Sequence, residues 1–193
     1  QINEALEVGI RSFGENYLQE AVEKIGALSA ANLDWHFIGP LQSNKTRTAA
    51  ENFAWVHSVD RLKIAQRLSA QRPEHLAPLN LCLQINIDNE PSKSGFSPQQ
   101  ALEAAVEIAD LPNIVLRGLM AIPRARAERA EQRIPFAHLR TLKDQMNELL
   151  DNSRKLDTLS MGMSGDMEAA ILEGATIVRV GTDIFGSREK QST

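Results

Sequence analysis

Residues 158–186 read TLSMGMSGDMEAAILEGATIVRVGTDIFG, and this stretch decides the fold. It contains a short apolar strand, a Ser/Gly loop, a helix from about Asp166 to Leu172 that ends at Gly174, and a second strand over 176–180. A strand, a helix and a second strand in this order indicate a βαβ unit, in which the two strands run parallel. The stretch therefore predicts an α/β protein with a parallel sheet.

The same alternation extends back through the chain. Further strands are expected at residues 11–16, 34–39, 55–59, 79–87 and 114–122, with helices at 2–10, 17–28, from 43, 61–70, from 97 and 136–150. These seven strands are apolar on both faces, as in a sheet that helices cover. A closed β/α barrel needs eight strands. We therefore expect a single parallel (β/α)8 TIM-type barrel domain over residues 1–193, incomplete at its N-terminus, with its first strand ahead of Gln1. A doubly wound open sheet is the alternative, although no Gly-rich fingerprint follows an early strand.

The composition argues against a nucleic-acid-binding, a disulfide-linked or a membrane-spanning protein. The 193 residues are 42% hydrophobic and 24% charged, with a formal net charge of −4, as in an ordinary globular domain. A nucleic-acid partner is not expected, because phosphate-backbone binding relies on clustered Lys and Arg. The single cysteine, Cys82, cannot form an internal disulfide, and no apolar run has the length of a membrane span. A cytoplasmic protein with a small-molecule ligand is the expectation.

Two loops near the C-terminus indicate a phosphate site. The first, residues 162–166 (GMSGD), joins a strand to a helix N-terminus, where backbone N–H groups and the helix dipole favour an anion. Helix capping by Ser164 or Asp166 is the alternative. In the second, Gly181 allows a close backbone approach and Thr182 adds a hydroxyl. Barrels often bind phosphate in the loops after strands seven and eight, and these two loops occupy those positions.

Arg179 interrupts the apolar run of the last strand, so we expect its guanidinium at the mouth of the barrel. A buried charge without a partner is costly, and Arg179 therefore needs an acceptor. That acceptor is either a structural carboxylate or a ligand, and the residues alone leave both open.

Six sequence motifs carry a resemblance to a known family. They are FGENY at 13–17, HFIGPLQSNK at 36–45, SKSG at 92–95, GLMAI at 118–122, SMGMSGDMEAA at 160–170 and RVGTDIFG at 179–186. In this order they resemble the YggS/PROSC-type pyridoxal phosphate homeostasis proteins over essentially the whole chain. The resemblance implies a barrel like the N-terminal domain of alanine racemase (fold type III), which carries pyridoxal 5′-phosphate (PLP) at its C-terminal mouth, and a monomer.

The resemblance also implies roles for individual residues. Ser164, Gly181 and Thr182 would hold the phosphate, and Arg179 would face the pyridine nitrogen. The residues expected to line the rest of the cofactor are Asn16, His36, Met120, Ser160 and Met163. Arginine does not readily release its proton, so the pyridine nitrogen would stay unprotonated and PLP would be a weak electron sink.

The sequence departs from the family at one point. The resemblance implies a Schiff-base lysine on the first barrel strand, in a Ser-Lys-Thr-Lys-like run that these residues do not contain. Lys45 and Lys93 follow strands and could reach the mouth, but neither lies inside a strand. Lys24, in contrast, belongs to an amphipathic helical pattern and is expected in solvent. We therefore assign no catalytic residue.

Three functions remain open. The first is a PLP-binding protein of PLP homeostasis and amino-acid or keto-acid balance, without turnover. The second is a racemase-like PLP enzyme, against which the chain lacks room for the second, β-rich domain of such enzymes. The third is a phosphosugar-handling barrel enzyme, which needs an acid–base pair of which Glu15 could be one member.

Several other residues have simpler interpretations. His36 is as compatible with a structural role as with a ligand contact, and His57 shows no metal-ligand spacing with the other histidines or Cys82. We therefore expect no metal site. Cys82 is interpreted as a small core residue. Residues 124–133 form a charged segment that we expect to be a solvated loop, with closure over the ligand as the alternative.

Overall fold

The computed structural model describes residues 1–186 and contains seven parallel strands. The strands pair in chain order as β1 (Ser12–Glu15), β2 (Asp34–Phe37), β3 (Trp55–Val59), β4 (Leu79–Gln84), β5 (Ile114–Met120), β6 (Thr158–Met163) and β7 (Ile177–Arg179). A sheet whose strands follow chain order is the arrangement of a β/α barrel rather than of a doubly wound sheet, in which the strand order reverses. The predicted barrel class and its seven strands are therefore confirmed.

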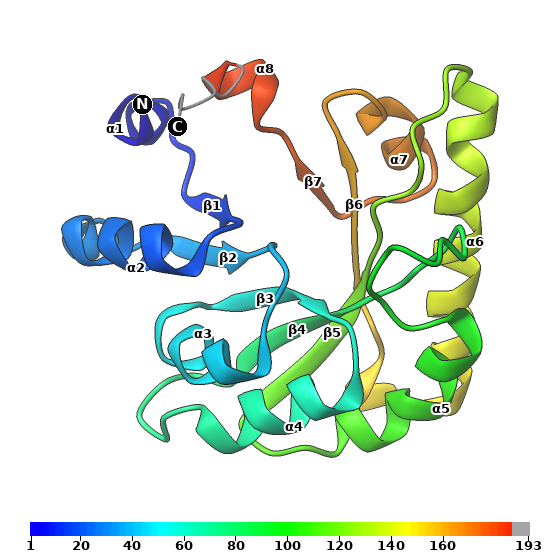
Figure 1. Cartoon of the computed structure of the whole chain (residues 1–193), viewed down its shortest axis with the longest axis horizontal. Helices are drawn as coiled ribbons and strands as arrows, with labels where there is room; N and C mark the ends of the chain where they lie inside the picture. The colour runs from blue at the N-terminus through cyan, green and yellow to red at the C-terminus, as the bar shows by residue number, and fades with distance from the viewer. Residues whose placement is uncertain (187–193) are drawn as a thin grey trace.

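Helices cover the outside of the curved sheet (Figure 1). They are α1 (Ile2–Glu7), α2 (Leu18–Ala27), α3 (Thr46–Asn52), α4 (Leu62–Gln71), α5 (Pro98–Ala109), α6 (Arg129–Leu149), α7 (Met167–Leu172) and α8 (Thr182–Phe185), with 3-10 turns at Ser29–Ala31, Ser43–Lys45 and Asn152–Arg154. The hydrophobic core lies between the sheet and these helices. Alternate residues of β4, Leu79, Leu81 and Leu83, are fully buried there, as are Ile64 and Leu68 of α4.

The barrel is open along one seam. Within residues 1–186, β1 pairs only with β2 and β7 only with β6, so the two end strands of the sheet face each other without hydrogen bonds between them. Helices α1 and α8 lie at the same end of this seam (Figure 1), where the Gln1 side chain donates a hydrogen bond of 3.5 Å to the Phe185 carbonyl. The seam therefore runs beside the two loops that the sequence singles out.

The inner face of the sheet carries several polar side chains. Trp35 and Phe37 are buried in the hydrophobic core between the sheet and the helices. The residues that alternate with them, together with their counterparts on the other strands, point inward. Among these inward residues are His36 and His57, whose side chains contact each other. A barrel interior built from histidine, arginine and hydroxyl groups suits a polar ligand better than a purely structural core does.

Local sequence signals account for several boundaries. Ser97 and Gln100 form a reciprocal capping box at the start of α5, a helix that the sequence predicts from residue 97, and Pro98 is its first helical residue. Gly162 adopts φ +94°, and a Cβ atom there would lie 2.6 Å from the Ala170 Cβ, so only glycine lets β6 run this close to α7. Gly39 is equally constrained, because its Cβ would meet the Asn16 carbonyl oxygen at 2.0 Å.

The predicted end of the loop over residues 124–133 is wrong. The loop expected over residues 124–133 ends at Glu128, because α6 begins at Arg129 and continues through Pro135. The preceding segment is also anchored, since Arg126 contacts Asp88 at 2.5 Å and the Arg124 backbone N–H donates to the same carboxylate at 2.7 Å. Residues 187–193 lie outside the described part of the chain.

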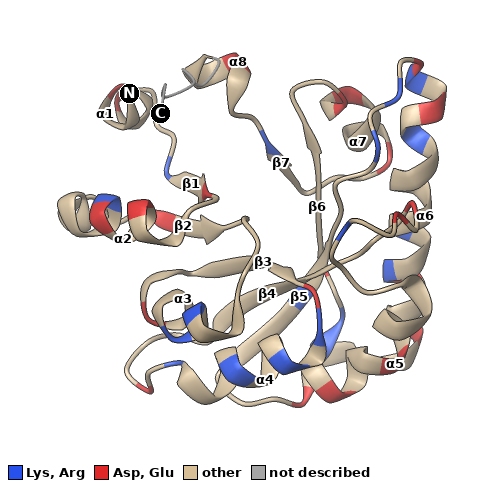
Figure 2. Cartoon of the chain, in the orientation of Figure 1, with Lys and Arg blue, Asp and Glu red and all other residues tan. Residues whose placement is uncertain are grey.

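Charges of both signs are spread over the outer helices (Figure 2). Within residues 1–186, no helix combines the length and the hydropathy that crossing a lipid bilayer requires.

Candidate functional site

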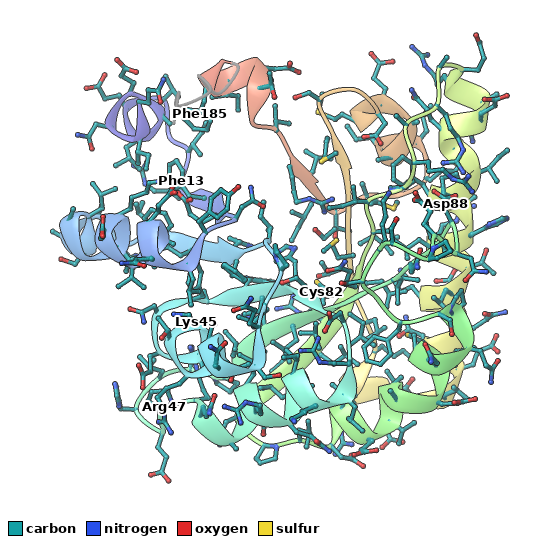
Figure 3. The ribbon with its side chains drawn as sticks, viewed as in Figure 1. Phe13, Lys45, Arg47, Cys82, Asp88 and Phe185 are labelled. Carbon is teal, nitrogen blue, oxygen red and sulfur yellow. The ribbon has the colours of Figure 1, made fainter. Side chains whose placement is uncertain are left out.

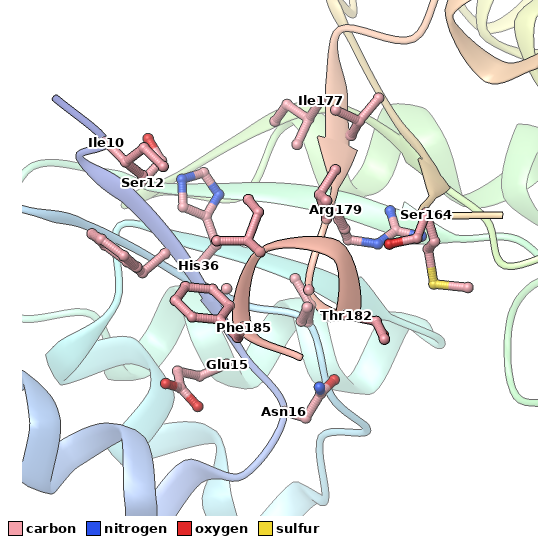
Figure 4. Close-up of a pocket in the computed structure, with 18 of the residues that line it drawn as sticks. Ile10, Ser12, Glu15, Asn16, His36, Ser164, Ile177, Arg179, Thr182 and Phe185 are labelled. Carbon is pink, nitrogen blue, oxygen red and sulfur yellow. The ribbon is translucent and has the colours of Figure 1, made fainter. Parts of the chain in front are cut away.

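A cavity of about 1160 Å³ lies along the open seam between β1 and β7. Its walls come from β1 and the residues after it, from β2 and β3, from the loop after β6, and from β7 with α8. The close-up in Figure 4 shows His36, Arg179, Ser164 and Thr182 grouped around this space, with Phe185 of α8 also against it. The cavity therefore brings residues of the first strands into contact with the same space as the two loops near the C-terminus.

Arg179 is the principal charged group of the cavity wall. Its Nη1 donates to the Ser160 carbonyl and to Ser160 Oγ, both at 2.7 Å, and its Nη2 donates to the Ala121 carbonyl at 3.1 Å. Within residues 1–186, no carboxylate lies within ion-pair distance of it. The structural carboxylate considered from sequence is thus not present in the described chain. Burial lowers the pKa of Arg179.

The loop after β6 is held by its own aspartate. Asp166 Oδ1 accepts a hydrogen bond of 2.7 Å from the Met163 N–H, and the Asp166 N–H donates to the Met163 carbonyl at 3.0 Å. Helix α7 has no side-chain cap, so the capping role considered for Ser164 or Asp166 is wrong. Ser164 instead lies in the cavity wall, beside Gly165. The aspartate fixes the loop, and the serine hydroxyl stays available to a ligand.

The second loop follows β7, the strand next to β6, and borders the same cavity. Gly181 precedes α8, and Thr182 is the first residue of that helix; both line the cavity. The N–H groups in the first turn of a helix have no intrahelical acceptor. Thr182 therefore contributes a hydroxyl and a backbone donor in the same neighbourhood as the Arg179 guanidinium (Figure 4).

A chain of hydrogen bonds leads from Arg179 through the barrel interior. Ser160 Oγ lies 2.7 Å from His57 Nδ1, and His57 Nε2 lies 2.9 Å from His36 Nδ1. The His36 ring stacks on Trp55, with centroids 5.5 Å apart and planes inclined by 12°. Burial lowers the pKa of His36 to about 4 and that of His57 well below its usual value, so both rings are neutral at pH 7.

The structure gathers most of the predicted ligand residues in one place. Of the nine, the residues in the cavity wall are Asn16, His36, Met163, Ser164, Arg179, Gly181 and Thr182. Met120 and Ser160 are not in the wall; both are buried, and Ser160 lies behind Arg179, to which it is hydrogen-bonded. In this arrangement Ser160 can therefore affect a ligand in the cavity only through Arg179.

His57 is the residue that sequence reasoning passed over. It lies 21 residues after His36 and 103 before Ser160, and it contacts both only because β2, β3 and β6 curve around one interior. Its position in the alternation of β3 was the available signal, since an inward histidine on a strand of a barrel needs partners for two ring nitrogens.

Other candidate residues have different surroundings from those expected. Lys24 is not simply solvated, because its Nζ lies 2.7 Å from Glu15 Oε1 at the border of the cavity. Glu15 is thereby occupied by an ion pair. Lys93 contacts the Ile122 carbonyl at 3.2 Å and Glu90 at 2.7 Å, and Lys45 lies beside α3 (Figure 3); neither lines the cavity.

Cys82 is confirmed as a core residue, fully buried at the centre of the sheet (Figure 3). Burial raises the pKa of its thiol to about 12, so it is protonated and a poor nucleophile.

Comparison with known proteins identifies the class first. Residues 1–189 match the family model of the alanine racemase N-terminal domain. An alanine racemase from Clostridium difficile, 15% identical, superposes with a TM-score of 0.71 over 96% of this chain and 47% of its own, a likeness of fold. The chain thus has the barrel of the alanine racemase N-terminal domain.

The family follows from closer relatives. The pyridoxal phosphate homeostasis protein of Pseudomonas aeruginosa is 60% identical over 188 residues, which are 97% of this chain and 79% of that protein. The structure of PipY from Synechococcus elongatus with PLP bound is 40% identical and has a TM-score of 0.87, over 96% of this chain and 86% of PipY. The chain belongs to the family of the pyridoxal phosphate homeostasis proteins.

Proposed function

We propose that this chain binds PLP in the cavity between β1 and β7 and serves in PLP homeostasis. The observation that carries the proposal is Arg179, a half-buried cation that lacks a carboxylate partner within residues 1–186 and lines a cavity bordered by two hydroxyl-bearing loops. PipY, with PLP bound, is a relative of the same fold and family.

The chemistry of the wall fits the groups that PLP presents. Ser164 and Thr182 supply hydroxyls, and Gly165 and Gly181 supply backbone without side chains, in the wall of one cavity. These are the donors that a phosphate ester requires. Arg179 would donate to the pyridine nitrogen, while Asn16, His36 and Met163 would border the ring. Met120 and Ser160 would support this arrangement from behind the wall.

A binding role without turnover is consistent with the electrostatics. PLP supplies an electron sink to enzymes when its pyridine nitrogen is protonated. A guanidinium donates a hydrogen bond and keeps its proton, so Arg179 would hold that nitrogen unprotonated. No acid–base pair stands out at the strand ends within residues 1–186, since Glu15 is paired with Lys24 and His36 is paired with His57.

The proposal also covers the domain organisation, the location and the partners of the protein. We propose one barrel domain over residues 1–193, with an open seam between β1 and β7 that has the geometry to accept an eighth parallel strand. We further propose a cytoplasmic monomer that exchanges a small molecule and uses neither nucleic acid nor membrane as a partner. The mixed surface charge and the net charge of −4 agree with this.

An equilibrium titration tests the proposal. PLP and unphosphorylated pyridoxal are titrated into the chain and into a Ser164→Ala/Thr182→Val variant, with absorbance and intrinsic fluorescence as readouts. We expect saturable binding of PLP and a loss of about 30-fold in the variant, roughly 2 kcal/mol for two hydroxyl contacts, against little change for pyridoxal. Equal losses for both ligands would mean that the two loops do not hold the phosphate.

A further inference from the structure

The hydrogen bonds inside the barrel form one continuous path whose two ends lie at the cavity. Arg179 and His36 are both in the cavity wall, and Ser160 and His57 join them from behind. Ser160 is fully buried and His57 is 1% exposed, so water does not substitute for either partner. The two interior residues therefore act on a ligand through the residues at the ends of the path.

The number of available protons fixes which group donates and which accepts in each of these hydrogen bonds. Arg179 Nη1 can only donate, so Ser160 Oγ accepts from it. Within residues 1–186, the other partner of Ser160 Oγ is His57 Nδ1. If His57 donated to Ser160, the serine proton would be buried without an acceptor, at the cost of a lost hydrogen bond. Ser160 therefore donates to His57 Nδ1.

The remaining protons then follow from neutrality of the two rings. With Nδ1 of His57 accepting, its single proton is on Nε2 and is donated to His36 Nδ1. The proton of His36 is consequently on Nε2, for which no partner is found in residues 1–186. Stacking on Trp55 fixes the plane of this ring. His36 thus presents an N–H to the cavity, and not a lone pair.

The same hydrogen bonds fix the orientation of the Arg179 guanidinium. Three of the five N–H groups of Arg179 are used on Ser160 O, Ser160 Oγ and the Ala121 carbonyl. This leaves the Nε–H and one Nη2 hydrogen for a ligand. Because Ser160 Oγ is held by His57, loss of His57 frees the serine rotamer and loosens one of the three anchors.

We propose that His57 is a positioning residue: through Ser160 it orients Arg179 toward the ring nitrogen of the ligand, and through His36 it sets a second hydrogen-bond donor in the cavity. The ligand is therefore selected for acceptors at both points, as an unprotonated pyridine with further acceptor oxygens provides. This inference rests on the proposed PLP site.

The test compares PLP with its 1-deaza analogue, in which a C–H group replaces the ring nitrogen. The ratio of the two affinities isolates the contact with the ring nitrogen from that with the phosphate. His57→Phe keeps a ring of similar size but removes both hydrogen bonds, and His57→Gln is the conservative variant. His138→Phe, at an exposed position of α6, is the matched control.

We expect the chain and the His138→Phe variant to prefer PLP over the analogue by about tenfold. In His57→Phe the preference should fall to about twofold while affinity for the analogue is kept, and His57→Gln should recover part of it. Ser160→Ala, a smaller change, should give the same loss. The ¹⁵N chemical shift of bound ¹⁵N-labelled PLP should move in both variants.

An unchanged preference in both His57→Phe and Ser160→Ala would overturn the inference while leaving the PLP site in place. Equal binding of both ligands by the unaltered chain would also overturn it, since Arg179 would then not contact the ring nitrogen. Absence of binding of either ligand by the unaltered chain would instead refute the proposed function, so the two failures are distinguishable.

Discussion

Replacing Arg179 by methionine separates ligand binding from folding. The substitution keeps an unbranched side chain of similar length and removes the guanidinium. In the unaltered chain, two of the five N–H groups of Arg179 remain for a ligand after its three internal hydrogen bonds are made. At about 1.5 kcal/mol for each charge-assisted hydrogen bond, the loss is about 3 kcal/mol. PLP affinity should therefore fall by roughly 100-fold.

The stability of the unliganded chain should respond much less. The variant loses three hydrogen bonds within the barrel, but it also relieves the burial of a charge that has no carboxylate partner in the described chain. Because these effects oppose each other, we expect the free energy of unfolding to change by about 1 kcal/mol or less. Urea unfolding measures the stability, and a PLP titration measures the affinity. A large loss of stability with unchanged PLP affinity would refute the reasoning, since Arg179 would then be a structural residue.

Three further predictions concern groups that support the barrel. Glu173 is 3% exposed and contacts two arginines of α6 at 2.6 and 2.7 Å, so Glu173→Gln should lower the free energy of unfolding by about 2 kcal/mol in urea denaturation; no change would show that the pairs are screened. Arg72 donates to three carbonyls at 2.6–2.9 Å, and thermal unfolding of Arg72→Met should show a loss of about 3 kcal/mol, against less than about 0.5 kcal/mol for the exposed Arg47→Met control. The pKa of His36 is lowered from 6.5 to about 4, so its contribution of roughly 3 kcal/mol is complete above pH 6.5 and is lost as the pH falls to about 4. His36→Gln should therefore flatten the dependence of stability on pH in this window, whereas His138→Gln should leave it unchanged.

The sequence was a good guide to the elements that local patterns define. The alternation of apolar strands with helical patterns predicted all seven strands, and a helix was expected from residue 97, where α5 begins at Pro98. The start of α6 was missed because the charged segment at 124–133 was interpreted as a solvated loop, whereas the helix begins at Arg129 and continues through Pro135. Local signals thus locate elements reliably where strands and helices alternate clearly, and less so where a charged segment is the first turn of a helix.

The site was predictable only in part, for a geometric reason. An arginine that interrupts an apolar strand, such as Arg179, indicates a charge inside the barrel. The Ser/Gly loop at 162–166 and the Gly181–Thr182 pair indicate hydrogen-bond donors near it. The partners of Arg179, in contrast, belong to other strands, and the contact between His36 and His57 depends on how the sheet curves. No spacing along the chain encodes a contact that arises from curvature. The inward position of His57 on β3 could be read from the sequence, but its contacts with His36 and Ser160 could not.

The most direct test of the account is a crystal structure of this chain soaked with PLP. The account predicts density in the cavity between β1 and β7, with the phosphate within hydrogen-bonding distance of Ser164 and Thr182 and the ring nitrogen facing Arg179. Density outside this cavity, or a ring turned so that its nitrogen points away from Arg179, would contradict it.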